Sequence, residues 1–179
     1  MRGTAGFLRI LTTIVMVILI IAIIVLAGVT AIFALAPGVL PEAAANGLLS
    51  SITIDGQPAT IEMLLTYGKV VLIASGIAML ILILETVVIG KIRTALGEVR
   101  DEKPFSERCS KSLGSAGVIE IIIGIIMIAA PCAGFFMGGD VLEASALSTA
   151  AGNGISSILF AIVLFMLAKI SEFGSRKSY

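Results

Sequence analysis

The sequence predicts an all-α integral membrane protein with four transmembrane helices, a small outer cap between the first and second spans, and a helical inner hairpin between the second and third. Hydrophobic residues make up 58% of the 179 residues and charged residues only 13%. A soluble chain of this length could not bury so much apolar surface. The apolar residues collect in four runs, each of about 20 residues or more, the length that crosses a bilayer.

These four runs are predicted to form a single membrane domain, residues 1–179. The predicted spans cover about residues 10–36, 69–93, 111–137 and 151–172, with outer loops at 37–68 and 138–150 and an inner loop at 94–110. The first span carries no charge from Ile10 onward. Ala34-Leu35-Ala36 resembles a signal-peptide cleavage site, but the apolar run is longer than a signal peptide requires and Pro37 follows directly, so we expect an uncleaved anchor.

The first outer loop contains no Lys or Arg. Its segment Ser51–Asp55 alternates like a short strand and leads into Asp55-Gly56, a strong turn signal. Thr60–Tyr67 is expected to form a short helix leading into the second span. A ligand site on this loop is one interpretation, and a small folded outer cap is the one we favour.

The inner loop between the second and third spans is the most highly charged part of the chain. Apolar residues at helical spacing predict that the second helix continues beyond the bilayer until Pro104 stops it. Ser106 is the predicted N-cap of the third helix. In that helix, Ala130, Gly134 and Gly138 recur at intervals of four, a pattern that favours close helix packing in lipid.

Orientation follows from the basic residues. Eleven of the twelve Lys and Arg lie at the N-terminus, in the inner loop with its flanks, or at the C-terminal end. The positive-inside rule therefore predicts a multi-pass protein of the plasma membrane with both termini in the cytoplasm.

Composition also excludes several kinds of function. The formal net charge is zero, so no basic field favours direct nucleic-acid binding. The chain has no His, which removes Ser-His-Asp triads and most zinc sites. Cys109 and Cys132 lie on one predicted helix about 34 Å apart and cannot pair within it. We expect no catalytic residues, no metal and no cofactor, and hence no enzyme.

Two acidic residues, Glu85 and Glu120, lie within predicted spans, about 9 Å and 13 Å inward from the nearest inner basic residue. A charged side chain at such depth costs on the order of 3 kcal/mol, so each carboxylate needs a partner, a proton or water. Facing each other, the two could share a proton or hold a cation. The simpler interpretation, which we favour, is that Glu85 reaches toward Lys91 or Arg93 and that Glu120 hydrogen-bonds a serine or backbone group between packed helices.

The inner segment EKPFSERCSKSLGSAG resembles a motif of the YoaS-like proteins, a four-helix bacterial membrane family of unknown function. The matching positions are Pro104, Phe105, Ser106, Leu113 and Gly117, whereas Lys103 and Cys109 depart from the pattern. The resemblance implies a small integral protein, often encoded beside a helix-turn-helix regulator, and hence a role in regulation or signalling.

Two functions from different classes remain. In the first, the protein is a non-enzymatic regulatory or accessory subunit that presents its inner basic loop to a helix-turn-helix regulator or another membrane subunit. In the second, it is a small proton- or cation-linked transporter or channel subunit that uses Glu85 and Glu120. Either function is compatible with a homo-oligomer. The residues expected to bind the partner are Arg100, Lys103, Pro104, Phe105 and Arg108. For Pro104 and Phe105, a helix stop with an interfacial aromatic anchor is the equally favoured alternative.

Overall fold

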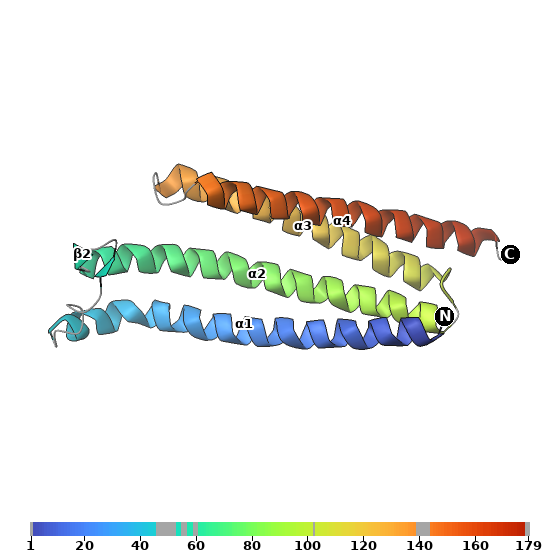
Figure 1. The fold of residues 1–179 in the computed structure, drawn as a ribbon, viewed down its shortest axis with the longest axis horizontal. Helices are drawn as coiled ribbons and strands as arrows, with labels where there is room; N and C mark the ends of the chain where they lie inside the picture. Colours follow the sequence, from blue (N-terminus) through green and yellow to red (C-terminus); the bar gives the residue numbers. More distant parts are fainter. Residues whose placement is uncertain are drawn as a thin grey trace. The chain divides into compact units, whose positions relative to one another are not determined.

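The structure of the protein is a computed structural model that describes residues 2–45, 53–54, 57–58, 61–101, 103–138 and 144–177. Four long helices account for most of them (Figure 1). In chain order the elements are α1 (Arg2–Ala45), β1 (Thr53–Ile54), β2 (Gln57–Pro58), α2 (Ile61–Arg100), α3 (Glu107–Gly138) and α4 (Ala144–Lys177).

Each helix contains a segment long and apolar enough to cross a membrane, which confirms the prediction of four such helices. These segments are Gly6–Ala31, Leu72–Arg100, Glu107–Pro131 and Ala151–Ser175.

The helices extend beyond the predicted spans into both predicted outer loops. Residues 37–45 and 144–150 are helical, although the sequence analysis assigned them to loops. Alanine explains much of this difference, because both segments are rich in this strongest of helix formers. The range of α1 includes Pro37 and Pro41, each of which lacks a backbone N–H donor, and the helix continues to Ala45.

The chain divides into two compact units, residues 21–80 and residues 1–20 together with 81–179. The unit of residues 21–80 contains the short hairpin, in which Thr53 lies opposite Pro58 and Ile54 opposite Gln57 in antiparallel register. The strand predicted at Ser51–Asp55 is therefore present over two residues. The predicted Asp55-Gly56 turn lies outside the described residues.

The other unit is built around one small apolar core. Val88 of α2, Ala116 and Ile123 of α3, and Leu164 of α4 are buried together. Half-buried side chains of α2 and α3 surround them: Ile81, Leu84, Ile92, Leu113, Ile119 and Met127. The core therefore joins these three helices.

Within this unit, α3 and α4 lie side by side and antiparallel (Figure 1). A methyl group added at Gly124 would lie 2.8 Å from the Gly154 carbonyl oxygen, and one added at Gly117 would lie 3.2 Å from the Ala161 carbonyl oxygen. Such distances leave no room for side chains, so glycine allows the two backbones to approach closely. The packing motif predicted at Ala130, Gly134 and Gly138 stays a prediction, because the surroundings of Gly134 and Gly138 lie outside the described part of the chain.

The contacts between α3 and α4 repeat every seven residues along both helices. Gly117 faces Ala161 and Gly124 faces Gly154, and one repeat earlier on α3 the Ser110 hydroxyl donates to the Ala168 carbonyl oxygen at 3.0 Å. A seven-residue repeat of small residues keeps one face of each helix turned toward its partner, as in antiparallel coiled coils.

The outward faces of the helices are strongly apolar. On α4 alone, Leu159, Met166 and Phe173 are more than half exposed, and α1 exposes many more large apolar side chains. Apolar surface of this extent is typical of helices that contact lipid.

Candidate functional site

The α2–α3 turn, defined here as residues 98–110, is held by a chain of backbone hydrogen bonds. The Lys103 N–H donates to the Glu98 carbonyl oxygen at 2.9 Å, and the Ser106 N–H donates to the Lys103 carbonyl oxygen at 3.1 Å. Pro104 and Phe105 lie between the two residues that this second bond joins, and α3 begins directly after Ser106. Helix α2 ends at Arg100, four residues before Pro104, and Lys103 lies outside both helices, as expected for a residue that precedes a proline.

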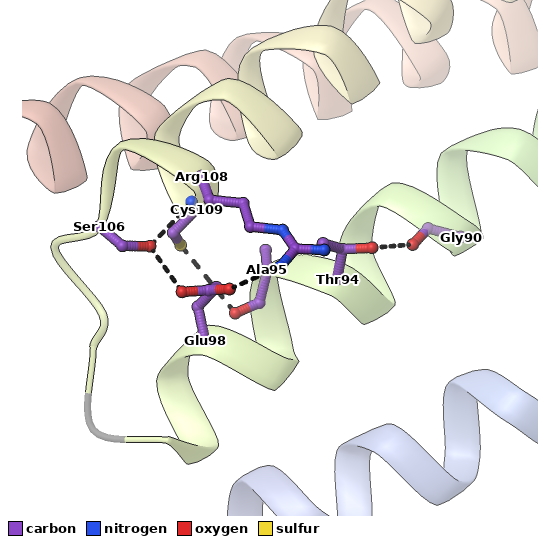
Figure 2. A network of polar contacts seen from close by, with 7 residues as sticks. All are labelled: Gly90, Thr94, Ala95, Glu98, Ser106, Arg108 and Cys109. Atoms are coloured by element: carbon purple, nitrogen blue, oxygen red, sulfur yellow. Dashed lines mark hydrogen bonds and ion pairs between the residues drawn. The ribbon is translucent and has the colours of Figure 1, made fainter.

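Ser106 caps α3, as predicted. Its hydroxyl oxygen accepts the Cys109 N–H at 3.0 Å, the bond that an N-cap makes to the third helical residue. The same hydroxyl donates to the Glu98 Oε2 atom at 3.0 Å, so one side chain ties the start of α3 to the end of α2 (Figure 2).

Two further contacts strengthen this link. The Arg108 Nη1 atom lies 3.7 Å from the Glu98 Oε1 atom, but the Arg108 side chain is 74% exposed, so the pair contributes at most about 1 kcal/mol. The buried Cys109 thiol lies 4.0 Å from the Ala95 carbonyl oxygen (Figure 2). Glu98 and Cys109 therefore hold the two helix ends together from the exposed and the buried side.

The α2–α3 turn is also attached to α4. The Ser171 hydroxyl donates to the Pro104 carbonyl oxygen at 2.8 Å, and Ser171 itself is buried. The Phe105 ring packs on Gly174 so closely that a methyl group added at Gly174 would overlap with the ring. With the bond from Ser110 to Ala168, this gives three points of attachment along the last three turns of α4.

The five residues predicted to bind a partner thus divide into two groups. Pro104 and Phe105 contact α4, although Phe105 is still 47% exposed. The three basic residues, Arg100, Lys103 and Arg108, are all exposed. The turn therefore combines a fixed backbone with a basic surface.

The two acidic residues within the spans lie in the same unit. Glu120 is buried between α3 and α4, where the Ser157 hydroxyl donates to its Oε2 atom and also lies 3.2 Å from its carbonyl oxygen. This confirms the expectation that Glu120 hydrogen-bonds a serine between packed helices. The Glu85 carboxylate is half-buried and lies within electrostatic range of Glu120. Among the described residues, neither Lys91 nor Arg93 forms an ion pair with Glu85, contrary to the expected pairing.

Sequence reasoning missed the residues of α4 that complete the site. Ser157, Ser171 and Gly174 carry no motif, and each acts through a residue far away in the chain. The available signal was the seven-residue spacing of small residues, with Ser110, Gly117 and Gly124 on α3 matched by Gly154, Ala161 and Ala168 on α4. Matching these two series in antiparallel register would have placed Ser157 beside Glu120.

Comparison with known proteins adds no relative: no protein-family model, no curated protein and no solved structure matches the chain.

Proposed function

We propose that this protein is a four-span integral protein of the plasma membrane, with both termini in the cytoplasm, that acts as a non-enzymatic regulatory or accessory subunit. Its α2–α3 turn is the docking element for a protein partner. Two kinds of partner fit: a cytoplasmic regulator of the helix-turn-helix class, which the YoaS-like motif suggests, and a second membrane subunit.

One observation carries this proposal: the α2–α3 turn is fixed to α4 at three points while its basic side chains stay exposed. A loop that served only to join two helices would need no such attachment. A fixed turn loses little conformational entropy when it binds, which favours affinity. The turn is therefore suited to recognition.

The two groups of residues have different roles in this proposal. Pro104 and Phe105 set the position of the turn through their contacts with Ser171 and Gly174. Arg100 and Lys103 contact the partner and select an acidic surface on it, because charge complementarity mainly determines specificity and association rate.

Co-purification from native membranes tests the proposal. The intact protein is compared with the double variant Arg100→Glu, Lys103→Glu, and companions are identified by mass spectrometry. We expect a stoichiometric companion that the double variant loses. Lys69→Glu is the matched control, because Lys69 is an exposed basic residue at the predicted outer boundary and should keep the companion.

The outcome separates docking from folding. A companion retained by the double variant contradicts the docking role of the basic residues. A third variant, Gly174→Ala, displaces the Phe105 ring without changing the turn sequence. If the ring positions the turn, this variant weakens binding of the companion although the basic side chains are unchanged.

A proton- or cation-linked transporter or channel subunit is the second candidate, and the electrostatic interaction between Glu85 and Glu120 favours it. Two carboxylates within one apolar bundle could bind a proton or cation in transit. The test is cation and proton flux into liposomes containing the purified protein. Flux that Glu85→Gln or Glu120→Gln abolishes would establish this function, and absence of flux would exclude it.

A further inference from the structure

A groove at the inner ends of α2 and α3 borders the α2–α3 turn, but Arg100 and Lys103, the proposed partner contacts, do not line it. Its volume is about 420 Å³, within the range of about 300–1,000 Å³ that is typical of small-molecule sites. Each lining residue has a polar or charged side chain. The residues are Lys91 from α2 and Glu107, Arg108, Lys111, Ser112 and Ser115 from α3.

The charges of this groove favour an anion. Three of its side chains are basic and one is acidic. Glu107 forms an ion pair with Lys111, in which the Lys111 Nζ atom lies 2.6 Å from the Glu107 Oε1 atom. Both side chains are more than 70% exposed. An exposed pair of this kind is weak and can open to admit a stronger ligand. On the opposite wall Lys91 is half-buried, so a ligand held between Lys91 and Lys111 is partly shielded from solvent.

The groove continues into two apolar stripes. On α3, Lys111 and Ser115 lie on the same face as Val118 and Ile122, which follow at helical spacing and are 50% and 44% exposed. On α2, Val87 lies one turn from Lys91 on the same face and is 42% exposed. Each wall therefore changes from basic to apolar in the direction of the predicted bilayer.

An amphipathic track of this form matches the shape of one ligand class. We propose that the groove binds an anionic phospholipid, with its phosphodiester between Lys91 and Lys111, its glycerol ester region near Ser115, and an acyl chain along Val87, Val118 and Ile122. Basic pockets between helices on the cytoplasmic side recognise anionic headgroups through the same chemistry. The inference depends on the proposed membrane insertion and is independent of the protein partner.

Native mass spectrometry of the purified protein in mild detergent tests the site with phosphatidylglycerol and phosphatidylcholine. Both lipids contain a phosphodiester, but only the first has a net negative charge. We expect preferential retention of phosphatidylglycerol, weakened about five-fold by Lys91→Gln or by Lys111→Gln and more by both. Lys169→Gln removes one exposed charge from α4, outside the groove, and should leave retention unchanged.

Two additional measurements distinguish the source of the phosphate and guard against misfolding. Glycerol 3-phosphate should not displace the lipid at equal concentration, because it lacks the acyl chain. Ser115→Asp places a negative charge in the groove, and the double variant Val118→Ser, Ile122→Ser removes the apolar stripe. Each variant should retain less lipid while eluting from a sizing column at the same volume as the intact protein, which shows that it is folded.

Four results would overturn the proposal. The first is equal retention of the two lipids. The second is an equal loss in Lys169→Gln, which would indicate a diffuse surface potential. The third is displacement by glycerol 3-phosphate, which would indicate a soluble ligand. The fourth is full retention by the apolar-stripe variant.

Discussion

Replacing Gly124 by Ala should weaken the α3–α4 pair, whereas the same change at Gly114 should not. A methyl group at Gly124 would lie 2.8 Å from the Gly154 carbonyl oxygen and 2.7 Å from the Ile158 Cγ1 atom. The isoleucine can rotate, but the backbone oxygen cannot. Restoring an ordinary contact of 3.4 Å requires the helices to separate by about 0.6 Å, the difference between 3.4 Å and 2.8 Å, and this disturbs the contacts above and below.

The expected magnitude comes from two opposing terms. Overpacking costs about 1–3 kcal/mol, and Ala instead of Gly in a helix returns up to about 1 kcal/mol. For Gly124→Ala the net loss of stability is therefore about 1 kcal/mol. A methyl group at Gly114 would lie 4.0 Å from the Ala168 Cβ atom, an ordinary contact, so that variant keeps the gain of up to about 1 kcal/mol without the loss.

Thermal unfolding in detergent, followed by loss of the monodisperse chromatographic peak, measures the difference. About 2 kcal/mol between the two variants corresponds to roughly 4–8 °C in Tm for a chain of this size. Gly117→Ala should fall between them, because its nearest contacts lie at 3.2 Å. Gly97→Ala, which has no heavy atom within 4 Å of the added methyl group, is the control for helix propensity. Equal Tm values for Gly114→Ala and Gly124→Ala would refute the close approach of α3 and α4.

Three further predictions concern single side chains. Ser106→Ala removes the N-cap of α3 and its bond to Glu98, and should lower the free energy of unfolding by about 1 kcal/mol in the same assay. The control is Ser156→Ala, which should change stability little because this exposed serine bonds only within its own helix. Equal effects of the two variants would contradict the capping role of Ser106. Ser157→Ala leaves the buried Glu120 carboxylate without its hydroxyl donor and should lower the free energy of unfolding by about 1–3 kcal/mol. An unchanged Tm would mean that Glu120 has another donor. In a Cys132→Ser background, the buried Cys109 should react with maleimide only after the protein is unfolded in SDS, and rapid reaction of the folded protein would show that the junction of α2 and α3 is open.

Much of the fold can be predicted because its signals are local. Four apolar runs of sufficient length predict four helices without any knowledge of their neighbours. Ser106 was identified as an N-cap from its position alone, since a cap bonds to residues only three positions away. The helix ends were less accurate, because alanine-rich segments extend α1 and α4 without adding to the hydrophobic pattern that defined the spans.

The pairing of helices could not be predicted in the same way. Intervals of four at Ala130, Gly134 and Gly138 form a recognisable motif within one helix, whereas the repeat of seven at Gly117 and Gly124 gains its meaning from the matching repeat on α4. Small residues are common in membrane helices, so one series alone does not select a partner.

The candidate site shows the same division between local and distant information. The charges of the α2–α3 turn and the two acidic residues could be found from the sequence. The role of Pro104 and Phe105 depends on Ser171 and Gly174, which are about seventy positions away. Without these contacts, Phe105 could not be assigned to positioning rather than to direct recognition.

Cysteine labelling from each side of the membrane is the most direct test that the basic turn faces the cytoplasm in a four-span protein. Lys103→Cys and Lys69→Cys are introduced separately into a Cys132→Ser background and treated with an impermeant maleimide in intact cells and in opened membranes. Lys69→Cys should react in intact cells, and Lys103→Cys only after the membranes are opened. Reaction of Lys103→Cys in intact cells would contradict the orientation, and with it the docking of a cytoplasmic partner at the α2–α3 turn.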